Sequence, residues 1–439
     1  MAVIRPFRAI RPAENLASEI ASLPYDVYST EEARERTKGH PLSFLRIDKA
    51  EVNFPEGVDP YQADVYQKAH DLFWEEVHEG DYRQDKAPGF YIYELTMQGR
   101  TQTGLVALTS VDDYKNGVIK RHEDTLEAKE NDRVRHVDIV NAQTGPVFLV
   151  NHKSQELKEL LEGQKNPDQL LFDFTTDQGV RERGFAIEDT SVIEKLKSIY
   201  ADLGPLYICD GHHRAAAAVK VCEKRRKYNP NYTGNEEFNY FLSVIFSEDE
   251  VKSLDYNRVF RSLNDLEPDE FLASLLFHCD FQPVLELGGK KQMEAEDPKA
   301  AMDAKHHEFL ETTVRPKEKG EFSVYIGGRW YLCKFHDDVR SDDPVEGLDV
   351  ALLQKYVCRE ILDIENPRTD PRIDYVGGIH GLEELENRCE KDCVLAIAMY
   401  PTSLSELMQV ADLGRRMPPK STWFEPKLLS GLFIHSLED

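Results

Sequence analysis

The amino-acid sequence predicts an α/β fold, in a mixed α+β arrangement of strands and helices. Segments with the alternating pattern of a strand and segments with helical spacing follow one another along the whole chain. Hydrophobic residues make up 41% and charged residues 31% of the composition, which is typical of a globular protein. The length of 439 residues allows two or three domain-sized cores. We expect a catalytic region at residues 1–265 and a second α/β region at 266–439, packed against the first or continuous with it.

In the N-terminal part, strands are expected at short apolar runs, and helices where apolar residues recur every three or four positions. Ser29 or Thr30 precedes two glutamates and is expected to cap a helix. Residues 97–100 separate two alternating runs, as the loop of a hairpin does. The expected strands are 2–10, 42–47, 89–96 and 101–109, and the expected helices are 29–37 and 60–79.

The same alternation continues through the rest of the chain. A charged, helix-prone stretch extends to residue 143, and an apolar run at 206–209 leads through a turn into a helix with four alanines. The further expected strands are 146–150, 172–174, 183–187, 241–246, 322–326, 329–335 and 393–400, and the further expected helices are 155–162, 190–200, 269–277, 298–312 and 347–361.

Charge and cysteine content exclude several classes of protein. The formal net charge is −26, from 80 acidic and 54 basic residues, and nucleic acids or anionic membranes attract the opposite balance. We therefore expect neither as a partner.

The first residues are interrupted by arginines and prolines, unlike a secretory signal, and no apolar run has the length of a membrane span. Seven cysteines, an odd number, indicate reduced thiols and a cytoplasmic location. The oligomeric state stays unknown.

The most informative motif is the run Asp210, Gly211, His212, His213 and Arg214. Glycine suits a tight turn, and the start of the following helix leaves backbone N–H groups that attract anions. Arg214 adds a planar fork of donors suited to phosphate or carboxylate. Asp210 could cap the helix, hold a metal or accept a proton. The motif predicts an anion-binding turn; the alternative is a plain strand–turn–helix whose histidines face water.

A second candidate lies at His122 and Glu123, beside Thr125. Removing a proton from a poor nucleophile such as an alcohol requires a carboxylate or imidazole within hydrogen-bond reach. His122 and Glu123 can supply such a base, the Glu123 carboxylate can also bind a metal, and Thr125 adds a hydroxyl group. The alternative is the solvated start of a charged helix, with Thr125 as its cap.

Two further residues are candidates for binding a substrate. Asp26 follows Pro24 and Tyr25 and could face the same pocket, or it could hold a turn. Arg46, which is expected at the end of the strand 42–47, could bind a carboxylate or pair with a surface acid.

These motifs together resemble a known family. From end to end the chain is similar to the bacterial and archaeal family called domain of unknown function 1015. The resemblance rests on residues 5–8, 24–27, 43–46, 121–125, 210–214 and 417–422. The family name implies no function.

A more distant resemblance implies a chemistry. An Asp-Gly-x-x-Arg turn before a helix is similar to the nucleotide-binding turn of ParB- and sulfiredoxin-like proteins, among which are kinases that phosphorylate free serine with ATP or ADP. This resemblance implies a ParB/sulfiredoxin-like nucleotide-binding core, with phosphates at residues 211–214 and Asp210 beside Mg²⁺. The position of the sulfiredoxin cysteine is His212 here, which makes their redox chemistry improbable. The acidic balance likewise speaks against ParB-like binding of DNA.

The resulting hypothesis is an Mg²⁺-dependent kinase that transfers a phosphoryl group from ATP or ADP to a small hydroxyl compound, with free L-serine as the expected acceptor. Phosphoryl transfer depends on positioning and on cations around the moving group. Glu123 is the expected base, His122 and Asp210 complete the catalytic group, and Asp210 and Glu123 are the expected Mg²⁺ ligands. Asp26 and Arg46 would bind the amino acid. Two alternatives stay open: a nucleotide-binding regulatory module without catalysis, and a hydrolase of phosphoesters or nucleotides.

Overall fold

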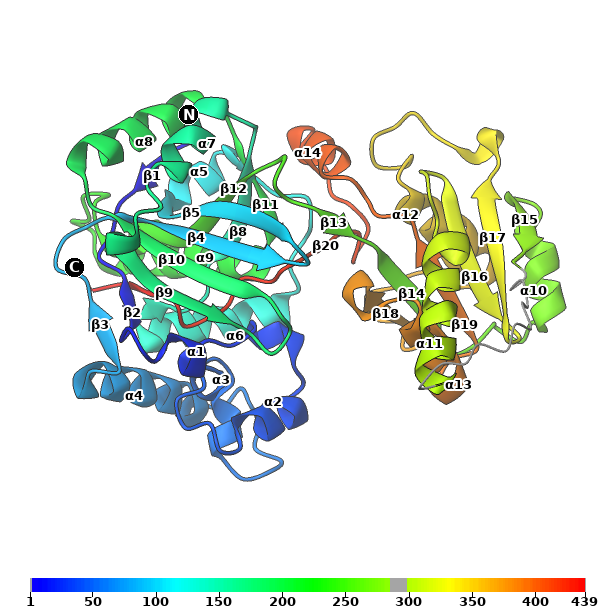
Figure 1. The fold of residues 1–439 in the computed structure, drawn as a ribbon, viewed down its shortest axis with the longest axis horizontal. Helices are drawn as coiled ribbons and strands as arrows, with labels where there is room; N and C mark the ends of the chain where they lie inside the picture. Colours follow the sequence, from blue (N-terminus) through cyan, green and yellow to red (C-terminus); the bar gives the residue numbers. More distant parts are fainter. Residues whose placement is uncertain (1, 285–297, 439) are drawn as a thin grey trace. The chain divides into compact units, whose positions relative to one another are not determined.

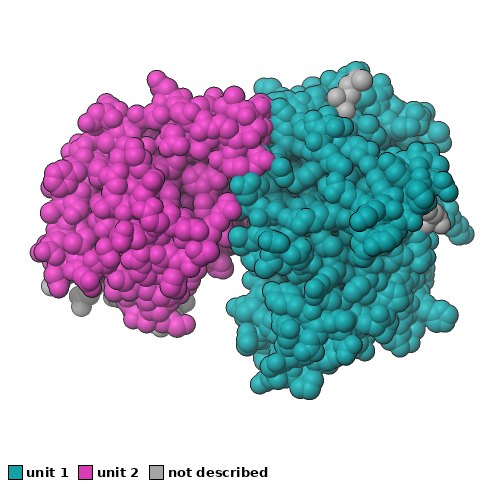
Figure 2. Space-filling model, turned by 180° about the vertical axis from the view of Figure 1, so that it is seen from behind, with its two compact units in different colours: residues 1–251, 426–439 teal, residues 252–425 magenta. Residues whose placement is uncertain are grey.

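Two groups of elements, each with its own sheet, make up the chain (Figures 1 and 2). In this computed structural model, residues 2–284 and 298–438 are described. The first unit consists of Met1–Val251 and Pro426–Asp439, and the second of Lys252–Glu425. Both units combine strands with helices, which confirms the expected mixed α/β class.

A nine-stranded sheet of mixed direction is the centre of the first unit. Strands β6 and β11 are parallel, as are β8 and β12, whereas the other neighbours are antiparallel. In spatial order the strands are β6 (Ile119–Lys120), β11 (Leu206–Asp210), β8 (Val147–Asn151), β12 (Tyr240–Ser247), β5 (Arg100–Ser110), β4 (Phe90–Met97), β10 (Arg181–Ile187) and β9 (Leu170–Thr175), and β1 (Ile4–Arg5) also pairs with β5.

The expected hairpin is formed by β4 and β5. Met97 pairs with Arg100, so the loop consists of Gln98 and Gly99 alone. Both residues have positive φ, +51° and +78°, as the type I′ turn of a two-residue hairpin requires. The turn fixes the register, and the buried residues of both strands then reach the core.

Several helices pack around this sheet (Figure 1). Helix α6 contacts both α9 and α4, so it lies between them. The first core joins the sheet to α7, α8 and α9, and the short side chains Ala215 and Ala218 let α9 approach the strands closely. A second core joins α3 and α4. The helices of this unit are α1 (Ala17–Ile20), α2 (Thr30–Thr37), α3 (Leu45–Asp48), α4 (Ala63–Glu79), α5 (Val111–Lys115), α6 (Glu127–Val140), α7 (Gln155–Glu162), α8 (Thr190–Asp202) and α9 (His212–Tyr228).

One expected strand is wrong. Residues 42–47 do not form a strand, because Leu45–Asp48 is the short helix α3. The helical turn directs Phe44 and Ile47 into the second core together, which an extended chain could not do for residues three apart. A short apolar run does not distinguish a strand from a buried helix. Arg46 therefore lies on a helix and not at a strand end.

The C-terminal segment belongs to the first unit. Ile434 pairs with Ile10 and Ser430 with Ser22. Further short pairs in this unit are β21 (His435–Ser436) with β7 (Ala142–Gln143), and β2 (Ile10–Pro12) with β3 (Tyr82–Gln84). These pairs bring residues near 430 to the elements that carry the candidate site.

The second unit has a six-stranded antiparallel sheet. The expected hairpin 322–326 and 329–335 is confirmed by β16 and β17. In spatial order the strands are β15 (Cys279–Pro283), β17 (Arg329–Phe335), β16 (Glu321–Ile326), β19 (Leu395–Met399), β14 (Tyr256–Phe260) and β18 (Ile373–Gly377); β13 (Ser253–Leu254) pairs with β20 (Trp423–Phe424), and the helices are α10 (Pro268–Leu275), α11 (Pro298–Phe309), α12 (Asp349–Leu352), α13 (Glu383–Lys391) and α14 (Leu404–Asp412). Across the described residues of both units, no helix combines the length and the apolar character needed to cross a membrane.

Candidate functional site

The turn between β11 and α9 has the geometry expected of an anion site. Strand β11 ends at Asp210, and helix α9 begins at His212. Gly211 lies between them with φ +91° and ψ +28°, a left-handed conformation that glycine adopts without steric cost. The first N–H groups of a 17-residue helix therefore start directly after a tight turn. Such a helix start favours a bound phosphate.

Arg214 is held beside this turn by the chain around it. Its Nη2 donates a hydrogen bond of 2.7 Å to Asp210 Oδ2, and its Nη1 donates to the backbone oxygen of Pro146. A Cβ added to Gly211 would lie 3.0 Å from Nε of Arg214, so glycine is needed for this close approach. Lys427 Nζ lies 3.6 Å from Asp210 Oδ1. Asp210 thus contacts two cations and orients the Arg214 guanidinium.

A second group of side chains lies at the first residue of α9. One ligand atom from each of His122, Glu123 and His212 lies within 4.8 Å of the other two. Both histidines are buried, with 2% and 7% of their surface exposed, and Glu123 is half-buried. The two imidazole rings meet edge to face, with their centroids 4.6 Å apart. Among the described residues, this group could hold a metal ion, and Asp210 is not a member of it.

Contacts between helices α6 and α9 bring the segment of Glu123 to the turn. The backbone N–H of Leu126 donates to His213 Nε2 over 3.0 Å. Glu130 on α6 accepts hydrogen bonds from Thr125 and pairs with Lys220 on α9, both at 2.5 Å. Burial raises the pKa of Glu130, but its bonds to Lys220 and Thr125 outweigh burial, and the net pKa is lowered. The carboxylate is therefore charged and holds α6 and α9 together.

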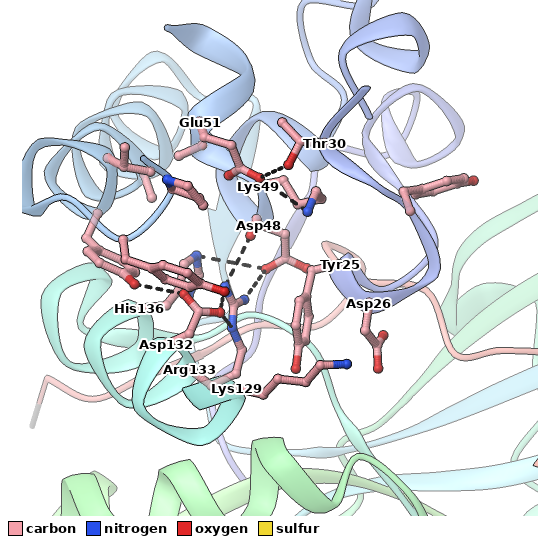
Figure 3. A pocket seen from close by; sticks show the side chains of 17 residues that line it. Tyr25, Asp26, Thr30, Asp48, Lys49, Glu51, Lys129, Asp132, Arg133 and His136 are labelled. Carbon is pink, nitrogen blue, oxygen red and sulfur yellow. Dashed lines mark hydrogen bonds and ion pairs between the residues drawn. The ribbon is translucent and has the colours of Figure 1, made fainter. Parts of the chain in front are cut away.

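A cavity of about 250 Å³ lies in the first unit, beside helix α6 (Figure 3). Tyr25 and Asp26, both on the 3₁₀ helix Tyr25–Val27, line it together with Arg133 of α6. The guanidinium carbon of Arg133 lies 3.9 Å from the centre of the Tyr25 ring. The polar residues that line the cavity are Tyr25, Asp26, Tyr28, Thr30, Asp48, Lys49, Glu51, Tyr61, Tyr66, Lys129, Asp132, Arg133 and His136. Charges of both signs in a small cavity suit a small zwitterion.

Burial and neighbouring charges set the ionisation of the cavity wall. Burial, and then the carboxylate of Asp26, raise the pKa of Tyr25, so its hydroxyl stays protonated at neutral pH. Burial and the positive charge of Arg133 lower the pKa of His136. Burial lowers the pKa of Arg133, but Asp132, Tyr25 and Asp48 together outweigh burial, and the net pKa is raised. The wall therefore has a fixed cation at Arg133 and a neutral imidazole behind it.

A smaller cavity adjoins the first one and reaches Arg214. It is lined by Arg214 together with Tyr25, Asp48, Arg133 and His136, and the last four also line the larger cavity. The Tyr25 and Arg133 side chains thus line both the larger cavity and the one that Arg214 lines. Of the expected residues, Asp26 lines the larger cavity and Arg214 the smaller one, whereas Glu123 lies beside His212 and lines neither cavity.

Arg46 lies outside this arrangement. Its Nε donates to Asn53 Oδ1 over 3.1 Å and its Nη1 donates to the backbone oxygen of Pro41, and it does not line the cavity. Sequence reasoning, in contrast, did not assign a role to Lys49 or Lys427. For Lys49, the only local feature that could have indicated its position is its pairing with Glu51, two residues further on. For Lys427, no neighbouring residue gives such an indication.

Comparison with known proteins places the chain in a family. No curated protein shows a significant match. A free serine kinase in complex with AMP is similar at 14% identity and a TM-score of 0.34, covering 73% of this chain and 86% of that one. A conserved hypothetical protein from Pyrococcus furiosus shows 14% identity and a TM-score of 0.33, with coverages of 74% and 94%. SbnI from Staphylococcus aureus, truncated at its C-terminus, is similar at 10% identity and a TM-score of 0.33, covering 74% of this chain and 85% of that one. Residues 4–351 match the model of the protein family of unknown function DUF1015, and the chain belongs to this family.

Proposed function

We propose that this protein transfers a phosphoryl group from ATP or ADP to the hydroxyl group of a small amino acid, with free L-serine as the first acceptor to test. One observation carries the proposal. Arg214, in the turn at Gly211, lines a small cavity that shares Tyr25 and Arg133 with a larger cavity carrying both signs of charge, and Glu123 lies beside His212 at the start of the same helix α9. Phosphoryl transfer requires these three parts, and the reaction needs little covalent chemistry from the protein.

The turn is the proposed site for the nucleotide phosphates. The N–H groups at the start of α9 and the Arg214 guanidinium provide donors in a nearly fixed geometry. His213 lies in the same first turn of the helix. Asp210 acts through Arg214, whose orientation it sets, and we propose it as a positioning residue.

The cavity beside Tyr25 is the proposed site for the acceptor. Asp26 would bind an ammonium group, and Arg133 with Lys129 would bind a carboxylate. We assign the carboxylate to these two cations and not to Arg46, because the Arg46 guanidinium contacts Asn53 and Pro41. Tyr25, which lines both cavities, would lie between the acceptor and the phosphates.

Glu123 is the proposed base for the acceptor hydroxyl. A carboxylate within hydrogen-bond reach of an alcohol can accept its proton as the phosphoryl group arrives. Mg²⁺ would accompany the nucleotide, held by phosphate oxygens and water molecules. We do not propose Asp210 as its ligand, because the Asp210 carboxylate contacts Arg214 and Lys427. A divalent cation there would neutralise charge on the transferred group.

The test is a product assay on the full-length protein. The protein is incubated with Mg²⁺ and ATP or ADP, with and without L-serine, and the products are identified by mass spectrometry. Phosphoserine formed only in the complete mixture supports the proposal. Loss of nucleotide without serine would indicate the hydrolase, and nucleotide binding without turnover would indicate the regulatory module.

A pair of variants then tests the base. Glu123→Gln keeps the shape of the side chain but removes the charge, so turnover should fall by about 100-fold or more while nucleotide binding is kept. Glu127→Gln, on the exposed first turn of α6, is the matched control and should behave as the unsubstituted protein. Equal activity in Glu123→Gln would remove Glu123 from the mechanism.

A further inference from the structure

We propose that His122, Glu123 and His212 bind a divalent transition-metal ion, such as Mn²⁺, Fe²⁺ or Zn²⁺, in preference to Mg²⁺. This inference goes beyond the proposed function, because the site would bind the ion whether or not the protein transfers a phosphoryl group. It rests on the arrangement of three donor side chains around one point and on the chemistry of those donors.

The distances are nearly those of a formed site. Nitrogen and oxygen ligands lie at about 2.0–2.2 Å from such ions, so two ligands of one ion are at most about 4.4 Å apart. The three ligand atoms here lie within 4.8 Å of one another. Side-chain movements of a few tenths of an ångström would therefore bring all three into range. Rotation of χ angles alone can supply such movements.

The donor set selects the class of ion. Mg²⁺ prefers an octahedron of oxygen ligands, many of them water molecules. Two imidazoles and one carboxylate suit transition metals instead, and the same combination with open positions is known from iron sites. Three protein ligands leave coordination positions for water or for an oxygen of a substrate. The expected Mg²⁺ pair, Asp210 and Glu123, does not match this grouping, because Asp210 contacts Arg214 and Lys427.

Position and burial also favour a bound ion. His122 and His212 are held in place by burial, which limits the entropy lost when they coordinate. Glu123 is half-buried, so the ion would be reached from its side. One carboxylate oxygen suffices for the ion, and the second stays available for the acceptor hydroxyl. The site also lies at the first residue of α9, next to the proposed phosphate site.

The test measures metal binding directly, on the full-length protein after removal of metals with a chelator. Isothermal titration calorimetry with Mn²⁺, Zn²⁺, Co²⁺ and Mg²⁺ should give one equivalent of each transition metal, bound at least about 100-fold more tightly than Mg²⁺. The visible absorption spectrum of the Co²⁺-bound protein should differ from that of hydrated Co²⁺, as expected when imidazole nitrogens replace water molecules. Mg²⁺ binding as tight as Mn²⁺ binding would overturn the proposal.

Variants identify the ligands. His122→Ala and Glu123→Gln should each weaken Mn²⁺ binding by about 10-fold or more, and the second keeps the shape of the side chain if the first impairs folding. His40→Ala, which changes an exposed histidine outside the group, should keep the metal. Unchanged Mn²⁺ affinity in both ligand variants would show that the two histidines only pack against each other. Phosphoserine formation by a protein without this affinity would refute the metal site and leave the proposed function standing.

Discussion

The substitution Gly211→Ala tests whether the turn positions Arg214. Gly211 has φ +91°, a conformation that costs an L-residue about 1–2 kcal/mol. The added Cβ would also lie 3.0 Å from Nε and 3.1 Å from Cζ of Arg214. The guanidinium must then move by a few tenths of an ångström, away from the Asp210 carboxylate and the Pro146 oxygen that hold it.

The two costs can be separated by a matched control. Gly80, the residue that ends α4, has φ +92°, and a Cβ added there meets nothing within 4 Å. Gly80→Ala therefore measures the backbone cost alone. A weakened hydrogen bond between charged partners adds about 1.5–3 kcal/mol, so Gly211→Ala should be less stable than Gly80→Ala by up to that amount.

Urea denaturation measures the stability of both variants, and calorimetry measures their affinity for ADP. We expect Gly211→Ala to lose both stability and about 10-fold or more in nucleotide affinity, whereas Gly80→Ala should lose stability only. Equal losses of stability in the two variants, with equal ADP affinity, would refute the idea that this glycine exists for the contact with Arg214.

Two further predictions concern buried ionisable side chains of the first unit. Burial raises the pKa of Glu182 from 4.5 to about 8, so the folded state keeps a proton that the unfolded state releases between these values. Glu182→Gln should therefore gain stability over the unsubstituted protein as the pH rises from 5 to 8, by up to about 4 kcal/mol in urea denaturation, and a difference that does not change with pH would contradict this. Arg133→Met removes a cation from beside Asp48, which is buried, with 4% of its surface exposed. This substitution should lower the free energy of unfolding by about 3–5 kcal/mol. Arg133→Lys keeps the charge but loses the planar contact with Tyr25, so it should weaken acceptor binding and lower stability less than Arg133→Met does. Equal losses of stability in thermal unfolding of the two variants would argue against the ion pair of Arg133 with Asp48.

Sequence reasoning succeeded where the determining contacts are local. The hairpin of β4 and β5 depends on two turn residues, Gln98 and Gly99, and on the alternation of the strands beside them. The turn at Gly211 likewise follows from a strand, a glycine and a helix in succession. In both cases the residues that decide the structure lie within a few positions of one another.

Sequence reasoning failed where tertiary contacts decide the conformation. The run 42–47 is apolar enough for a strand, but Phe44 and Ile47 complete a core with α4, which requires a helical turn. The contact of Lys427 with Asp210 joins positions on distant segments, and it depends on C-terminal pairs such as Ser430 with Ser22. No periodicity near residue 427 could indicate that contact.

The candidate metal group shows how the two kinds of information combine. His122 and Glu123 are adjacent in one motif and His212 lies in another, and the sequence alone leaves the distance between the motifs open. That distance is set by the packing of α6 along α9, where Glu130 pairs with Lys220 and Leu126 bonds to His213. These contacts touch none of the three metal ligands. The ion pair of Glu130 and Lys220 should therefore influence metal affinity from outside the ligand set, because the donor atoms converge only while α6 stays in place.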